Sequence, residues 1–332
     1  MQFSFSSFRR ALPVFTLGSL LTFAASTAAA TGLVDGFNVT IFNNFKSQFT
    51  DLQGTLAVGK NLSLTGYALN QSAPNPNTAA GGFDTVIGGS MLFQNGTIYG
   101  KVSASSASIS GASVCAGCLT IGSAPIDFGQ LESTVKNQSS FLYTLSSTGT
   151  VTQPYSTLTL TGSGTAFEVF TLSSAQLNGN SGIAVTGVAA NATILINVTD
   201  SGSHSATTSG GGFSINGQQL QNAQNVVFNF ASSITTISIA NSFYSSMLAP
   251  SANVIGSYGA FNGDLVASSY SGSNQFNLDP FTGNIPTPPV ATLEPATLGL
   301  FAIAALLMVA GAFRRNCRDQ KRTNQLTAIE SQ

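Results

Sequence analysis

The stretch Val58-Gly59-Lys60-Asn61-Leu62-Ser63-Leu64 is echoed further along the chain by Ile87-Gly88-Gly89-Ser90-Met91-Leu92-Phe93. Each stretch places short apolar alternations on both sides of a glycine-containing turn, which is typical of β-strands. A second pair, residues 96–105 and 259–268, shares the order Gly, apolar, Gly, apolar, Ala, Ser. Small residues within short strands suit a solenoid, because bulky side chains would not fit where coils turn and backbones approach closely. The sequence therefore predicts a mostly β domain built from stacked coils.

Other apolar alternations between Gly, Asn and Ser residues predict further strands. They lie at residues 56–64, 85–93, 156–160, 194–198, 226–230 and 234–239. A β-sandwich is the alternative fold, since it would explain the number of strands and the frequency of turns equally well. It would not explain the high content of Gly, Ala and Ser inside the strands.

One segment departs from the strand pattern. Between residues 127 and 146 the apolar side chains Phe128, Leu131, Val135, Leu142 and Leu145 recur at near-helical spacing. A proline precedes the segment and a glycine follows it, as at helix ends. We expect one amphipathic helix, packed along a face of the β body, with Glu132, Lys136 and Gln138 in water.

The two ends of the chain predict export and anchoring. Residues 1–30 have two arginines, an apolar run and small residues at the end, which is the pattern of a secretory signal peptide. Residues 296–313 are apolar and long enough for a transmembrane helix of about 27 Å. The basic tail at residues 314–332 favours a cytoplasmic location, so the sequence predicts a single-pass type I cell-membrane protein. Residues 286–295 contain four prolines and predict a stiff stalk below an extracellular domain at residues 31–285.

Charge excludes one class of partner. Charged residues are 7% of the chain, and residues 31–295 hold four lysines against ten acidic residues, a net charge of −6. No basic patch is available for nucleic acid. The partners we expect are the membrane and, outside it, surface glycans or matrix proteins.

Cysteines and sequons provide candidate modification sites. Cys115 and Cys118 form a Cys-x-x-Cys motif outside the membrane, where a local disulfide is expected rather than half of a zinc site. Cys317, next to the basic flank, is a candidate for lipidation. Asn-x-Ser/Thr sequons make seven asparagines candidates for glycosylation, although this many is about what composition alone would produce. They are Asn38, Asn61, Asn70, Asn95, Asn137, Asn191 and Asn197.

Several motifs together resemble the choice-of-anchor A domain family over residues 33–285. They are residues 37–39, 54–62, 194–198, 226–230, 247–252, 263–265 and 280–283. The resemblance implies an extracellular surface module joined to a variable anchor, with no catalytic residues to transfer. By analogy with ice-binding-like proteins, it also implies a right-handed parallel β-solenoid with a flanking helix.

The carboxyl-terminal region resembles a PEP-CTERM sorting signal. Glu294-Pro295 is followed by an apolar helix and then by Arg314-Arg315. Leu293 occupies the place of the usual first proline, and the chain continues to Gln332 after the basic cluster. These departures favour a permanent membrane helix over a cleaved anchor.

Catalytic chemistry finds little support in the residue pattern. The single histidine, His204, lies in a polar loop and is expected to be a solvated surface residue. A glycosidase would need paired carboxylates, and folding would have to bring together Asp127, Glu168 or Asp264. Clustered oxygen ligands for calcium are absent from the sequence, so we expect no cofactor and no metal.

The function we predict is adhesion or a structural role at the cell surface, without catalysis. An ice- or glycan-binding module is one alternative, suggested by Thr157, Thr159 and Thr161 on one face of a strand. That alternative requires threonines in register across several coils. A glycan-active hydrolase is the other alternative, and it requires two converging carboxylates in a groove.

Overall fold

The computed structural model describes residues 33–34, 36–72, 80–208 and 212–289. The predicted signal peptide, transmembrane helix, cytoplasmic tail and Cys317 lie outside the described residues. Within those described ranges, no helix is both long enough and apolar enough to span a membrane.

The described chain is mostly β, as predicted, and its strands form two sheets. The long sheet contains β1 (Val39–Ile41), β2 (Phe45–Gln48), β3 (Asp51–Leu52), β4 (Leu56–Val58), β5 (Leu62–Leu69), β6 (Thr85–Ile98), β7 (Val102–Val114), β8 (Leu119–Ile121), β11 (Phe167–Ser173), β13 (Thr193–Thr199), β14 (Ser205–Thr208), β17 (Ala223–Phe230), β18 (Thr236–Ile239), β19 (Ser245–Gly256), β20 (Ala260–Asn262), β21 (Leu265–Gly272) and β22 (Gln275–Asn277). The short sheet contains β9 (Thr150–Thr152), β10 (Thr157–Thr161), β12 (Gly182–Thr186), β15 (Gly212–Ile215) and β16 (Gln218–Leu220). In the long sheet every described pairing between named strands is parallel, whereas a β-sandwich would be built from antiparallel hairpins.

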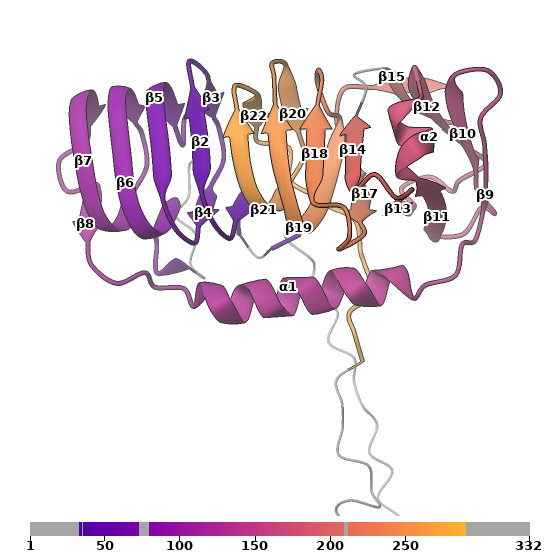
Figure 1. Cartoon of the computed structure of the whole chain (residues 1–332), viewed down its shortest axis with the longest axis horizontal. Helices are drawn as coiled ribbons and strands as arrows, with labels where there is room; N and C mark the ends of the chain where they lie inside the picture. Colours follow the sequence, from indigo (N-terminus) through magenta and orange to yellow (C-terminus); the bar gives the residue numbers. More distant parts are fainter. Residues whose placement is uncertain (1–32, 35, 73–79, 209–211, 290–332) are drawn as a thin grey trace, which may run out of the picture.

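Coils stack side by side, and the chain enters the stack in its middle (Figure 1). Val39 of β1 is in register with Leu56 of β4 on one side and with Leu265 of β21 on the other. From β1 the coils continue through β4, β5 and β6 to β7 at one end of the stack. The chain then passes along the stack and returns through β11, β13, β17 and β19 to β21. The first and last coils of the domain are therefore neighbours.

The sequence echoes occupy matching places in the coils. Val58 pairs with Ile87 and Leu64 pairs with Phe93, so the two echoing stretches lie directly on one another. The second pair of echoes places Val102 and Leu265 in one row of the sheet, joined through the intervening strands. Matching residues of the echoes therefore lie in matching rows of the parallel sheet.

Glycines allow the coils to approach at their corners. A Cβ atom on Gly88 would lie 2.2 Å from the carbonyl oxygen of Gly59, and one on Gly59 would lie 2.2 Å from that of Phe42. Inside the coils an aromatic ladder fills the core, with Phe276 packed against Phe45, Phe261 and Tyr270. The small residues that predicted close backbone approach therefore have that role.

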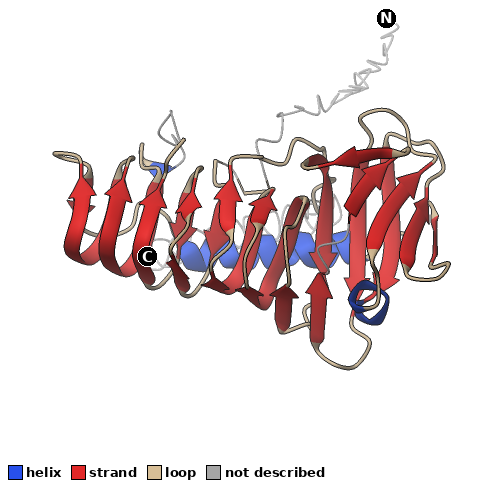
Figure 2. Ribbon diagram, turned by 90° about the horizontal axis from the view of Figure 1, so that it is seen from above, coloured by secondary structure: helices blue, strands red, loops and turns tan. Residues whose placement is uncertain are grey.

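Helix α1 (Phe128–Tyr143) lies alongside the stack (Figures 1 and 2). Asp127 caps its first turn by accepting a hydrogen bond from the N–H of Gln130. Its buried side packs on outward side chains from the first strand of successive coils, and together they form one apolar cluster. From these strands the cluster contains Ala57, Val86, Leu195, Val227, Leu248 and Val266.

Two details of the helical structure differ from expectation. Gln138 is not free in water, because it is half-buried and donates a 2.7 Å hydrogen bond to the carbonyl oxygen of Pro286. A short helix, α2 (Ser174–Asn178), was not predicted, since its five residues carry no helical periodicity. It begins with a capping box formed by Ser173 and Gln176.

The predicted stalk begins against the domain. Residues 278–289 contain neither helix nor strand, yet Phe281 is buried beside the core under α1. The contact between Gln138 and Pro286 holds the first proline of the predicted stalk next to the helix.

Candidate binding face

The second strand of each coil forms a flat surface that lies outside the helix-covered row. We call this surface the ladder face; it is made by β7, β6, β5, β2, β21, β19, β18 and β14, which pair in that order. Eight strands at about 4.8 Å spacing give the surface a length of about 34 Å. The coils beneath it are filled by buried side chains such as Leu62, Met91 and Tyr270, so a packed core supports the face.

The central row of the ladder face consists of in-register outward side chains. It contains Ser108, Leu92, Ser63, Lys46, Ser271, Ile255, Ser238 and Thr207. All eight are at least partly exposed, and Leu92 and Ile255 are 40% and 46% exposed. Lys46 carries the one charge of the row. Short hydroxyls around two apolar contacts make a flat surface suited to contact with another flat or extended surface.

Two exposed aromatic residues stand at the corner beside this face. Phe49 follows β2 and is 75% exposed, and Tyr258 follows β19 and is 62% exposed. Only β21 separates their strands, so the two corners lie about 10 Å apart. Exposed aromatic rings offer flat apolar faces that polar hydroxyl rows do not.

Threonines are also in register on the short sheet, which lies at the end of the stack away from β7 (Figure 1). Thr161 of β10 pairs with Thr150 of β9 and with Thr186 of β12, and Thr159 pairs with Thr152. The register reaches three strands of the short sheet. It does not extend along the ladder face, whose central row contains one threonine.

The three carboxyl groups considered for catalysis have separate structural roles. Asp127 caps α1, Glu168 is the second residue of β11, and Asp264 directly precedes β21. Four strand spacings, about 19 Å, separate the rows of Glu168 and Asp264. The structure does not bring these carboxyls together.

The environments of the two buried carboxyls shift their pKa values in opposite directions. Burial raises the pKa of Asp264 to about 6, although Leu33, Phe281 and Asn38 all donate hydrogen bonds to it. Burial also acts to raise the pKa of Glu168. Hydrogen bonds from Thr148, Thr165 and Ser163 outweigh that effect, so the pKa of Glu168 lies below its usual value. Burial therefore explains the shift at Asp264, and local hydrogen bonding explains the shift at Glu168.

His204 is a surface residue, as predicted. Its Nδ1 lies 2.6 Å from Oδ2 of Asp200, and its side chain is 66% exposed. Asp200 also accepts hydrogen bonds from the N–H groups of Gly202 and His204. The Asp200 carboxyl group therefore stabilises the turn that contains His204. Within the described residues, no group of three or more His, Cys, Asp or Glu side chains is placed to hold a metal ion.

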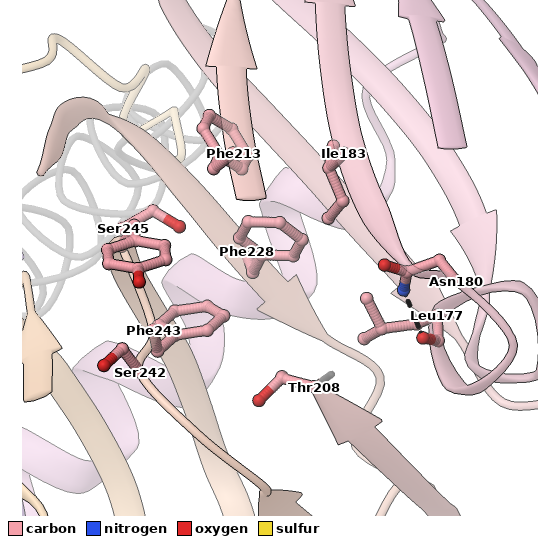
Figure 3. Close-up of a pocket in the computed structure, with 10 residues that line it drawn as sticks. Leu177, Asn180, Ile183, Thr208, Phe213, Phe228, Ser242, Phe243 and Ser245 are labelled. Atoms are coloured by element: carbon pink, nitrogen blue, oxygen red, sulfur yellow. Dashed lines mark hydrogen bonds between the residues drawn. The ribbon is translucent and has the colours of Figure 1, made fainter. Parts of the chain in front are cut away.

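Two cavities of the domain differ in volume and in the side chains that line them. One, of about 20 Å³, lies where β12, β17 and α2 meet, and Phe213, Phe228 and Phe243 line it (Figure 3). It has room for about one water molecule. The other, of about 350 Å³, lies between α1 and the coil corners, lined by Lys136, Tyr143 and several serines. No carboxyl group lines either cavity.

The candidate modification sites differ in accessibility. Cys115 and Cys118 are joined by a disulfide with Cα atoms 5.4 Å apart. Asn38, Asn70 and Asn197 are buried, and each donates a side-chain hydrogen bond to a backbone carbonyl. In the folded chain only the exposed sequon asparagines could carry a glycan. These are Asn61, Asn95, Asn137 and Asn191.

Sequence reasoning missed the ladder face itself. The alternation in residues 62–64 and 91–93 indicates which side chains point outward, but not which coils are neighbours. Ser63 and Leu92 could be paired from the sequence echo, whereas Lys46 and Ser271 could not, because 225 residues separate them.

Comparison with known proteins gives one match. The family model described as "Putative Ice-binding-like adhesive domain" matches residues 30–278, which is most of the chain. No curated protein and no solved structure matches the chain.

Proposed function

The chain belongs to the ice-binding-like adhesive domain family, and from that premise we propose that it is a non-catalytic adhesive protein that binds through its ladder face. The observation that carries this proposal is the in-register row of mostly short polar side chains across eight coils, broken by Leu92, Lys46 and Ile255. A nearly uncharged surface supported by a packed core binds by shape and hydroxyl contacts rather than by charge.

The ligands that we propose are surface glycans or matrix proteins. Phe49 and Tyr258 favour glycans, because exposed aromatic rings at the edge of a polar face can pack on the apolar side of a sugar ring. Ice binding is the alternative use of a flat face, and the threonines of β9, β10 and β12 favour it only over a small area. The separated carboxyls argue against a hydrolase.

We propose a narrower placement for the whole chain. It is a choice-of-anchor A protein with a right-handed solenoid, exported by residues 1–30 and held by residues 296–313 as a single-pass membrane protein with a PEP-CTERM-like anchor. The sequence motifs at both ends support this placement. Protease accessibility on intact cells tests it, because an outward domain is digested while the basic tail is protected.

Binding arrays of glycans and matrix proteins test the adhesive proposal. The purified chain is compared with Ser63→Lys/Ser271→Lys, which crowds the centre of the ladder face, and with Asn137→Lys on the exposed side of α1. We expect the double variant to lose at least tenfold in affinity for a bound ligand and the helix variant to bind normally. Equal binding by all three chains, or no binding by the unchanged chain, would overturn the proposal. The ice-binding alternative is tested separately, by measuring the thermal hysteresis of a solution of the purified chain.

A further inference from the structure

Strand β7 is the outermost long strand at one end of the stack, and most of its outer edge is unpaired. β6 pairs with β7 along its length, whereas β8 pairs only with Val102, Ser103 and Ala104. The rest of β7, including Ser106–Ser110 on the ladder face, presents backbone N–H and C=O groups at the end of the sheet (Figure 1). Such an edge can accept another strand.

The edge lacks the features that usually prevent strand addition. β7 contains neither proline nor a charged residue, and the nearest charges along the chain are Lys101 and Asp127. Its inward side chains Ile109, Ala112 and Val114 are only half-buried, because no further coil covers them. This end therefore leaves both hydrogen-bonding groups and the edge of the core open.

The strand is complementary to itself. The segment Ser106-Ala107-Ser108-Ile109-Ser110 alternates outward serines with inward apolar residues in both directions. Antiparallel pairing of two copies about Ser108 would place serines opposite serines and Ala107 opposite Ile109. With no charge on the edge, such pairing meets no like-charge repulsion.

We propose that two copies of this chain associate through the β7 edges, with a two-fold axis at Ser108 perpendicular to the ladder face. Isologous pairing of this kind satisfies the segment Ser106–Ser110 of both edges at once and leaves that segment of neither copy free for growth. The two inward faces cover each other's open core edge. The two ladder faces then form one continuous surface of sixteen strands, which would double the contacts available for the proposed adhesion. The pairing itself does not depend on what the face binds.

Cysteine cross-linking tests the axis directly. The full chain with Cys317→Ser is compared with the same chain carrying Ser108→Cys, and with Ser63→Cys as an equally outward control inside the stack. Opposite residues in antiparallel strands have Cα atoms about 4.5–5.5 Å apart, which suits a disulfide. We expect Ser108→Cys to be recovered under oxidation mainly as a dimer that reductant dissolves, and Ser63→Cys to remain uncross-linked. Equal cross-linking of the two variants, or none at Ser108→Cys, would contradict the proposal.

Charge variants test the interface without a covalent bond. Mass measurement of the full chain in detergent micelles should give a dimer, which Ser108→Lys and Ser108→Asp each reduce at least tenfold. Mixing these two variants should restore it, and circular dichroism confirms that each variant is folded. A monomeric unchanged chain would overturn the proposal, and so would a dimer that survives Ser108→Lys, since another segment would then hold it. Ser63→Lys should keep the dimer while weakening adhesion, so the two proposals fail separately.

Discussion

The backbone N–H of Leu33 donates a 3.0 Å hydrogen bond to Oδ2 of Asp264, across 231 residues of sequence. The same oxygen accepts a 3.1 Å hydrogen bond from the N–H of Phe281, and Oδ1 accepts one from Asn38. One buried carboxyl group therefore connects the first described residues, the last coil and the segment that leaves the domain.

Stability should depend on pH through Asp264. Its folded-state pKa of about 6 exceeds the value near 3.9 of an unfolded chain, so the folded state holds the proton more tightly. The contribution of this group to the free energy of unfolding therefore falls as pH rises from about 4 to about 6, by about 3 kcal/mol. Asp264→Asn should remove that dependence, which urea denaturation at several pH values would measure. An unchanged pH profile in the variant would contradict this.

Glu168 should act with the opposite sign. Its folded-state pKa is lowered, so its stabilising contribution is present above the unfolded value and is lost as pH falls through the folded value. Glu168→Gln should therefore make the protein less sensitive to pH below about 4, where glutamate ordinarily titrates. The same denaturation series detects it, and a variant whose free energy of unfolding falls below pH 4 as steeply as that of the unchanged chain would argue against this assignment.

Asn229 should be needed to attach α1. Its Oδ1 accepts a 2.6 Å hydrogen bond from the Ser139 hydroxyl, and its Nδ2 donates to the Ser139 carbonyl and to Asn197. Asn229→Ala leaves these buried groups without partners, at a cost of about 1–3 kcal/mol in the free energy of unfolding. The exposed control Asn137→Ala should change it by less than about 0.5 kcal/mol. Similar losses in the two variants would rule out the buried network as the cause.

Gly88 should be intolerant of a side chain. A Cβ at this position would lie 2.2 Å from the Gly59 carbonyl oxygen, so Gly88→Ala must push two coils apart. We expect a loss of about 1–3 kcal/mol, measured by thermal or chemical unfolding. Gly122→Ala is the matched control, because its Cβ would meet no atom within 4 Å. A tolerated Gly88→Ala would mean that the coils are not packed this closely.

The aromatic corner should contribute to glycan binding. Phe49→Ala and Tyr258→Ala each remove an exposed ring, so neither should alter unfolding appreciably. For a glycan that the array identifies, each should weaken binding about two- to tenfold, which corresponds to 0.5–1.5 kcal/mol. Tyr155→Ala, another exposed aromatic, is the control, and an equal effect there would remove the corner from the site.

Much of the local structure could be predicted from the sequence. Alternating apolar residues in segments such as 226–230 predict strands, and the spacing from Phe128 to Leu142 predicts α1. The echo of residues 58–64 in residues 87–93 predicts a register that the structure contains. These features are local or repeated, so residue patterns are enough to find them.

The order of the coils could not be predicted. Nothing in residues 39–41 indicates that β1 lies between β4 and β21, because parallel strands with similar apolar residues can pair in many orders. The composition of the ladder face follows from that order. Helix α1 carries the chain from one end of the stack to the other, and this crossing determines which coils become neighbours. Where the crossing ends depends on tertiary contacts, which the local sequence does not indicate.

The central position of the last coil determines how the domain would respond to mechanical force. β21 pairs with β19 on one side and with β1 and β2 on the other, so a pull transmitted through Phe281 reaches a strand with partners on both edges. Extracting that strand requires two ladders of hydrogen bonds to rupture together, whereas a terminal coil could be peeled off one bond at a time. A molecule loaded from its carboxyl-terminal side is thus strongest where the tension enters.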